Sequence, residues 1–177
     1  RGTLAADAIR VLRKARFASE IHLVETSAAL RQAQGERIED AQWHERIEDL
    51  PQVPLLLVAN EFLDALPVRQ WVGDEERRIG LSDEGFAFTT NGEVQEDSPA
   101  RDEAAKAIGK HLGQHGGVAL IIDYGHVRSA PGDTLQGVKG HRFADPLANP
   151  GEQDLTAHVD FEALAQAGAD INTVISG

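Results

Sequence analysis

The sequence has 177 residues, 41% hydrophobic and 26% charged, which is typical of one folded domain with its own core and excludes a disordered chain. Its 29 acidic and 17 basic side chains give a formal net charge of -12, which disfavours nucleic acid as a partner because phosphate groups are repelled. The absence of cysteine excludes disulfides and cysteine-ligated zinc, and no apolar run is long enough to span a membrane.

The first part of the chain predicts a helix, a strand and a second helix. Apolar residues recur at helical spacing after Thr3. Residues 21–25 form a short β-rich run that ends in an acid, and Ser27 then begins a helical stretch to about Gln34. The segment around Trp43 has no clear period and is left unassigned.

Two continuous apolar runs, at residues 55–59 and 118–122, predict strands that are buried on both faces, as in a parallel sheet. Between them, the Ser-Pro pair at 98–99 supplies a cap and a first helical residue, which predicts a helix to about Leu112. A loop rich in Pro and Gly follows the second run, and a last helix is predicted over 161–167.

Residues 71–93 have a different pattern, with turn signals such as Asn91-Gly92 between short strand-like runs, and predict a small antiparallel insertion. Elsewhere strands alternate with helices. The predicted fold class is therefore α/β, doubly wound, with a mostly parallel sheet. We expect a single domain over residues 1–177 that is incomplete at both ends, since the sequence begins at Arg1 and contains no methionine.

Polar side chains follow three of the predicted strands. Glu25 ends the first, Asn60 and Glu61 follow the second, and Asp123 follows the third. In an open parallel sheet, ligands bind just outside the carboxyl ends of the strands. If the three strands are parallel, these side chains lie along one edge and form a binding site.

Glu25 lies 23 positions after Gly2, where nucleotide-binding sheets place an acid that accepts hydrogen bonds from ribose hydroxyls. The alternative is a solvated carboxylate at a strand end. The spacing does not distinguish an adenosyl sulfonium cofactor from a dinucleotide. Arg1 and Gly2 before a helix fit the end of a glycine-rich loop, or an ordinary start of a helix.

Asn60, Glu61 and Asp64 form the densest polar cluster beside an apolar strand. Such a cluster can hold a methyl acceptor in line with a sulfonium methyl, and a carboxylate can stabilise positive charge or take a proton as nitrogen is alkylated. The alternative is that Asn60 caps a turn and Asp64 is solvated.

His111 and His115 have the i, i+4 spacing that can bind a metal on a helix. They also lie near the predicted end of that helix, where positive charge is favourable. We favour the second interpretation. His158 and Asp160 lack an evident third ligand, so we expect no metal site.

Six segments of the chain resemble, in order and sequence, the MidA family of S-adenosylmethionine-dependent methyltransferases. The resemblance extends from Arg1 to Leu164 and is most specific in residues 60–71 and 154–161. The segments are RGTLAADAIRVL, IHLVETSAALR, VANEFLDALPVRQW, ALIIDYGH, GDTLQGVKGH and DLTAHVDFEAL.

The resemblance implies S-adenosylmethionine as the cofactor. By position, Arg1 and Gly2 match the end of the glycine-rich cofactor loop, Glu25 matches the acid expected to hold the ribose, and Asn60 lies near the transferable methyl. The glutamate- and glycine-containing stretch and the first strand of the family would precede Arg1. We therefore expect that these residues alone do not make the complete cofactor site.

For the acceptor side, the polar cluster predicts Glu61 and Asp64 as catalytic residues together with Asn60. The resemblance implies that Asp123 and Tyr124 belong to the segment that closes the site, and we expect them to bind the substrate. The family includes an assembly factor of mitochondrial respiratory complex I that methylates an arginine of a complex I subunit. The implied partner is accordingly a protein substrate, with a respiratory complex subunit as one candidate.

Two other functions stay open from the residues alone. Glu25 fits a nicotinamide-dependent oxidoreductase equally well, and a non-catalytic assembly or scaffold protein could retain the fold. The location expected is the cytoplasm if the protein is bacterial and the mitochondrial matrix if it is eukaryotic. The oligomeric state is not predicted.

Overall fold

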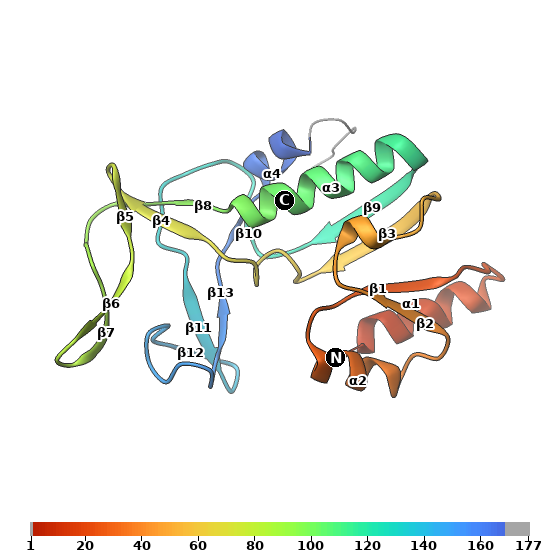
Figure 1. Ribbon diagram of the computed structural model, residues 1–177, viewed down its shortest axis with the longest axis horizontal. Coiled ribbons are helices and arrows are strands. Elements are labelled where there is room, and N and C mark those ends of the chain that lie inside the picture. Colours follow the sequence, from red (N-terminus) through yellow and green to blue (C-terminus); the bar gives the residue numbers. More distant parts are fainter. Residues whose placement is uncertain (1, 169–177) are drawn as a thin grey trace. The chain divides into compact units, whose positions relative to one another are not determined.

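The computed structural model describes residues 2–168 of the chain (Figure 1). It divides into two compact units, Arg1–Gln52 and Val53–Gly177, which are considered in turn. Whether the two belong to one domain stays a prediction.

The first unit contains two helices and a pair of parallel strands. Its elements are α1 (Thr3–Lys14), β1 (Ile21–Val24), α2 (Ala28–Gly35), β2 (Ala41–His44) and the 3₁₀ helix η1 (Ile47–Asp49). The Ser27 hydroxyl accepts the Leu30 N–H at 3.3 Å and caps α2. β2 is the strand that the sequence pattern left unassigned, and its Trp43 lies opposite Leu23 of β1.

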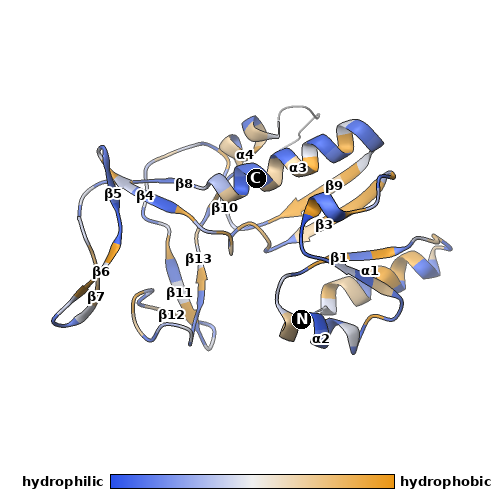
Figure 2. Ribbon diagram, viewed as in Figure 1, coloured by the Kyte–Doolittle hydropathy of each residue, from blue (hydrophilic) through white to orange (hydrophobic). Residues whose placement is uncertain are grey.

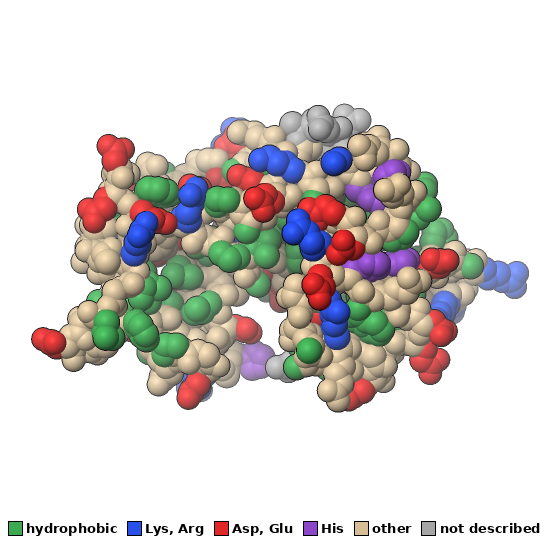
Figure 3. All heavy atoms as spheres, in the orientation of Figure 1, with side chains coloured by type: hydrophobic (Ala, Val, Ile, Leu, Met, Phe, Trp, Pro, Cys, Tyr) green, Lys and Arg blue, Asp and Glu red, His purple; other side chains and the backbone are tan. Residues whose placement is uncertain are grey.

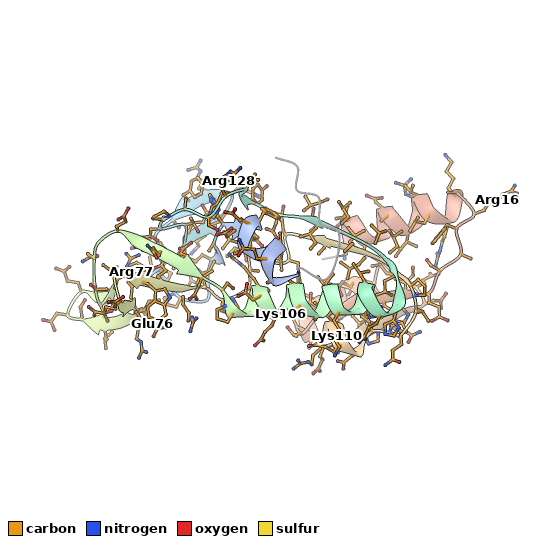
Figure 4. All side chains as sticks on the ribbon, turned by 90° about the horizontal axis from the view of Figure 1, so that it is seen from above. Arg16, Glu76, Arg77, Lys106, Lys110 and Arg128 are labelled. Atoms are coloured by element: carbon orange, nitrogen blue, oxygen red, sulfur yellow. The ribbon has the colours of Figure 1, made fainter. Side chains whose placement is uncertain are left out.

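The second unit is built on the parallel strands β3 (Leu55–Asn60) and β9 (Gly117–Ile122), joined by a connection that contains α3 (Pro99–His115). Ser98 caps α3 and Pro99 is its first residue, as the sequence predicts. The buried side of α3 carries Ala104, Ala105 and Ile108, whereas Lys106 and Lys110 are on its exposed side (Figure 4). Figure 1 shows α3 lying along β9.

The prediction that these two strands are buried on both faces is wrong. Burial alternates along each strand, and the five apolar side chains of one face are about half exposed: Leu56, Val58, Val118, Leu120 and Ile122. Figure 2 shows β3 and β9 as mostly hydrophobic along their length. Since the ladders join β1 to β2 and β3 to β9 separately, one sheet that contains all three predicted strands stays a prediction.

Between β3 and α3 all the strands pair antiparallel. β4 (Arg69–Val72) lies between β5 (Glu75–Arg77) and β8 (Val94–Asp97), and β6 (Ile79–Ser82) forms a hairpin with β7 (Gly85–Phe88). Figure 3 shows hydrophobic side chains at the surface of these hairpins, where Leu81 and Phe86 are exposed. That residues 71–93 are an insertion in the fold stays a prediction.

The segment after β9, predicted as a loop, contains further strands. β10 (Gly125–His126) pairs in parallel with β14 (Val159–Asp160), and an antiparallel sheet has the order β12 (Arg142–Ala144), β11 (Gln136–Lys139), β13 (Asp154–Thr156). α4 (Phe161–Ala167) has the predicted bounds and packs against α3. The chain is thus a mixed α/β protein with parallel sheets. No helix in residues 2–168 has the length and apolar character that a membrane span requires.

Candidate functional site

Glu25, at the end of β1, is held in place by its neighbours in the first unit. Its N–H donates to the His44 carbonyl at 3.0 Å. One carboxylate oxygen accepts the Ser27 N–H at 2.9 Å, and the other accepts the Gln34 Nε2 at 3.2 Å. Because each carboxylate oxygen has two acceptor positions, Glu25 can still accept hydrogen bonds from a ligand hydroxyl.

Gln34 links Glu25 to Gly2. The Trp43 Nε1 donates to the Gln34 Oε1 at 2.9 Å, which fixes the orientation of the amide that donates to Glu25. Gly2 has φ +82°, and a Cβ there would lie 3.3 Å from the Gln34 Cα and Cγ atoms, so glycine fits this position. The structure thus brings Gly2 and Glu25 together around Gln34. Arg1 lies outside the described residues.

The second group of predicted residues follows β3. Asn60 is the last residue of the strand, and Glu61 continues the ladder by donating its N–H to the Ile122 carbonyl at 2.9 Å. Both side chains are exposed. Glu61 has φ +48°, a left-handed conformation that costs a non-glycine residue about 1 kcal/mol or more and is concentrated at functional sites.

Asp123 fixes the segment that follows Glu61. One of its carboxylate oxygens accepts the N–H groups of Leu63 at 2.8 Å and Asp64 at 3.3 Å, and the other accepts the Tyr124 N–H at 3.0 Å. Its hydrogen-bond partners are therefore backbone groups of its own chain. The Tyr124 side chain is 65% exposed. The predicted contact of both residues with substrate stays a prediction.

Asp64 differs from Glu61 because it is buried, with 8% of its surface exposed. Burial is the main cause that raises the pKa of the Asp64 carboxyl, and the negative charges of Asp123 and Glu61 raise it further. The Asp64 carboxyl thus holds a proton more tightly than an ordinary aspartate. Of the two carboxylates predicted to position an acceptor, the exposed Glu61 is the one that a large substrate can reach.

Arg101, in the first turn of α3, is a residue of this site that the sequence patterns did not reveal. It is 6% exposed and donates to four backbone carbonyls, those of Leu63, Asp64, Ala157 and His158, at 2.7–3.3 Å. Burial lowers the pKa of its guanidinium, and Asp123 opposes that shift. One sequence feature could have identified Arg101: it is an arginine in the first turn of a predicted helix, where the helix dipole disfavours a cation.

The structure gives no support for a metal site at the histidines. The His111 and His115 rings lie 4.9 Å apart near the end of α3, and His111 Nε2 lies 3.0 Å from the Val53 carbonyl oxygen. Within residues 2–168, no group of three or more His, Asp or Glu side chains could hold a metal ion.

These features define a class of protein: an α/β chain with polar side chains at the carboxyl ends of parallel strands, where nucleotide-like ligands bind. A family profile described as "putative S-adenosyl-L-methionine-dependent methyltransferase" matches residues 1–91 and 78–176. The chain belongs to this family.

Named relatives are similar over nearly all of the chain. A mitochondrial protein arginine methyltransferase NDUFAF7 homolog of Drosophila melanogaster is 33% identical, with 93% of this chain and 49% of that protein covered. The NDUFAF7 protein arginine methyltransferase of Danio rerio, also mitochondrial, is 30% identical, with 96% and 52% covered. The chain thus spans about half the length of these relatives.

A solved structure extends the similarity to the fold. A Burkholderia thailandensis protein crystallised with S-adenosyl-homocysteine is 27% identical and superimposes with a TM-score of 0.75. The superposition covers 95% of this chain and 52% of the other. The fold described above is therefore one that occurs in a protein that binds the product form of the methyl donor.

Proposed function

We propose that the full-length protein transfers the methyl group of S-adenosylmethionine to an arginine side chain of a protein. The observation that carries the proposal is the exposed, conformationally strained Glu61, placed beside Asn60 where β3 and β9 end side by side. The names of the Drosophila and Danio relatives support the reaction, and the S-adenosyl-homocysteine in the Burkholderia structure supports the cofactor.

The residues around Gln34 fit the cofactor. Gly2 leaves the backbone open where a Cβ would be crowded, and Glu25 keeps acceptor positions for ribose hydroxyls. S-adenosylmethionine supplies the sulfonium-bound methyl group. A doubly wound sheet in the full-length protein is part of the proposal, with Glu25 as the residue that holds the ribose.

Glu61 is proposed to orient the acceptor. The pKa of a guanidinium lies far above neutral pH, so the acceptor arrives protonated, with donors that match a carboxylate in a two-point hydrogen bond. When the new N–C bond forms and the S–C bond breaks, the guanidinium nitrogen must lose one proton. Glu61, three positions before the buried Asp64, stabilises that charge and accepts the proton.

The net charge of -12 suits a cationic acceptor. A subunit of a respiratory complex is the candidate substrate, which follows from the resemblance to the MidA family. The location proposed is the mitochondrial matrix for a eukaryotic protein and the cytoplasm for a bacterial one. The Drosophila and Danio relatives are named mitochondrial.

The test is transfer of a radiolabelled methyl group to proteins in a lysate from a strain that lacks the protein. Wild type should label a protein on arginine. Glu61→Gln keeps the shape of the side chain but removes its charge, so labelling should fall on the order of 10²-fold while cofactor binding is retained. Glu84→Gln, an exposed change between β6 and β7, is the matched control and should label like wild type.

Two results would contradict the proposal. If wild type binds S-adenosyl-homocysteine but labels no protein, a scaffold role replaces the enzymatic one. If Glu61→Gln labels as fast as Glu84→Gln, another group orients the acceptor.

A further inference from the structure

The buried guanidinium of Arg101 joins two loops that are distant in sequence. Nε donates to the Leu63 carbonyl at 2.8 Å, and Nη2 donates to the Ala157 carbonyl at 2.8 Å and the Asp64 carbonyl at 3.3 Å. Nη1 donates to the His158 carbonyl at 2.7 Å. The loop after β3 and the turn before β14 therefore share one cation.

The backbone at Leu63 and Asp64 is held from both sides. Arg101 binds the two carbonyls, while the Asp123 carboxylate accepts the two N–H groups. The Ala157 N–H adds a third link by donating to the Asp64 carbonyl at 3.1 Å. Since Leu63 is itself almost completely buried, this segment cannot shift without breaking several hydrogen bonds.

The placement of Arg101 is energetically unfavourable in other respects. Its guanidinium is buried in the first turn of α3, where the helix dipole repels a cation, and its described hydrogen-bond acceptors are carbonyls and not a carboxylate. A neutral side chain would avoid both penalties. Such a side chain could not bind four carbonyls of two loops at once, which the fixed fork of guanidinium donors allows.

We propose that Arg101 is a positioning residue for methyl transfer, acting through the backbone of residues 63–64 to hold Glu61 in its left-handed conformation. Only Phe62 separates Glu61 from the clamped segment. The inference rests on the proposed function, because it assigns to Arg101 the placement of the group that orients the acceptor.

The experiment compares Arg101→Lys with Arg77→Lys in the full-length protein. Arg77, labelled in Figure 4, is a matched control: its side chain is largely buried and bonds Asp133 at 2.6 Å and Gln70 at 2.9 Å, without a described bond to residues 61–64. The measurements are kcat and KM for methyl transfer, S-adenosyl-homocysteine affinity by calorimetry, and the melting temperature. All kinetic and binding assays are run at a temperature below the melting temperature of each variant.

An ammonium cannot span the four carbonyls, so Arg101→Lys should lower kcat on the order of 10- to 10²-fold, with cofactor affinity within about threefold of wild type. Arg77→Lys should keep the wild-type kcat. In the double variant Glu61→Gln/Arg101→Lys, kcat should be no lower than in Glu61→Gln alone, because both changes remove one function. Additive losses would overturn the proposal, as would equal kcat for Arg101→Lys and Arg77→Lys.

Ser98→Ala provides a second variant in case Arg101→Lys does not fold. The Ser98 hydroxyl donates to the Pro67 carbonyl at 2.6 Å and accepts the Arg101 N–H at 3.3 Å, so its loss should loosen the placement of Arg101 and lower kcat severalfold. An unchanged kcat for Ser98→Ala would then reject the inference. If wild type transfers no methyl group, the proposed function itself has failed, which is a distinct result.

Discussion

Asp64 is a buried carboxyl whose raised pKa makes stability depend on pH. Because its folded pKa lies above the ordinary value of 3.8, its ionisation destabilises the folded state. This loss is absent below pH 3.8, grows as pH rises through the folded pKa, and is complete above it. Asp64→Asn does not titrate, so it should be more stable than wild type at pH 7.

The measurement is urea unfolding of both proteins at pH 4 and pH 7. The advantage of Asp64→Asn should shrink toward pH 4, while other carboxyls titrate alike in both proteins. A variant that is less stable than wild type at pH 7, or a difference independent of pH, would show that the Asp64 charge is well compensated in the folded protein.

At the scale of residues, the sequence predicted where the acidic side chains lie but not their hydrogen-bond partners. Strand ends predicted the positions of Glu25, Glu61 and Asp123, because an acid after an apolar run is a local feature. The bonds of Asp123 to a loop 59 and 60 positions away, and the four carbonyl bonds of Arg101, depend on tertiary packing. No local pattern encodes them, so the sequence could not predict the burial of Asp64 or the bonds of Arg101.

Among the elements, the short parallel pair β10 and β14 depends on a glycine. A Cβ at Gly125 would lie 2.0 Å from the Val159 carbonyl oxygen, a distance at which the strands must separate. Gly125→Ala should therefore destabilise the protein by about 1–3 kcal/mol, as overpacking does. The check is the free energy of unfolding in urea.

Gly113→Ala is the control for this substitution. Gly113 is exposed on α3, and a Cβ there would meet no heavy atom within 4 Å. Alanine should stabilise the helix by about 0.5–1 kcal/mol. If the two variants change stability in the same direction, the close approach of β10 and β14 does not govern the result.

Elements with end signals were predictable, and short paired strands were not. The helices predicted after Ser98-Pro99 and over 161–167 correspond to α3 and α4, because capping residues and helical spacing are features of neighbouring residues in the sequence. β2 and β11 are only four residues long, and their strand character comes from partners elsewhere in the chain. The continuous apolar runs predicted parallel strands correctly, but the apolar side chains on one face of these strands are about half exposed.

At the scale of the whole molecule, the chain spans about half the length of the Drosophila and Danio relatives. The two profile matches overlap at residues 78–91, inside the predicted insertion, and the alignment with the Drosophila protein runs over 217 positions, more than the 177 residues of this chain. The Drosophila protein therefore carries residues without a counterpart here. We propose that residues 71–93 are the region where members of the family differ in length.

We propose that Glu25 holds the ribose of S-adenosylmethionine in the full-length protein. The most direct measurement is calorimetric titration of the full-length protein with S-adenosyl-homocysteine and with NAD, for wild type, Glu25→Ala and Glu20→Ala. Glu20 precedes β1 and is exposed, so it is the control at the opposite end of the same strand.

Wild type and Glu20→Ala should bind S-adenosyl-homocysteine equally and not bind NAD. Glu25→Ala should bind it at least a few-fold more weakly, since a hydrogen bond to a charged group contributes about 1.5–3 kcal/mol. Unchanged affinity in Glu25→Ala, or binding of NAD in preference to S-adenosyl-homocysteine, would contradict the account.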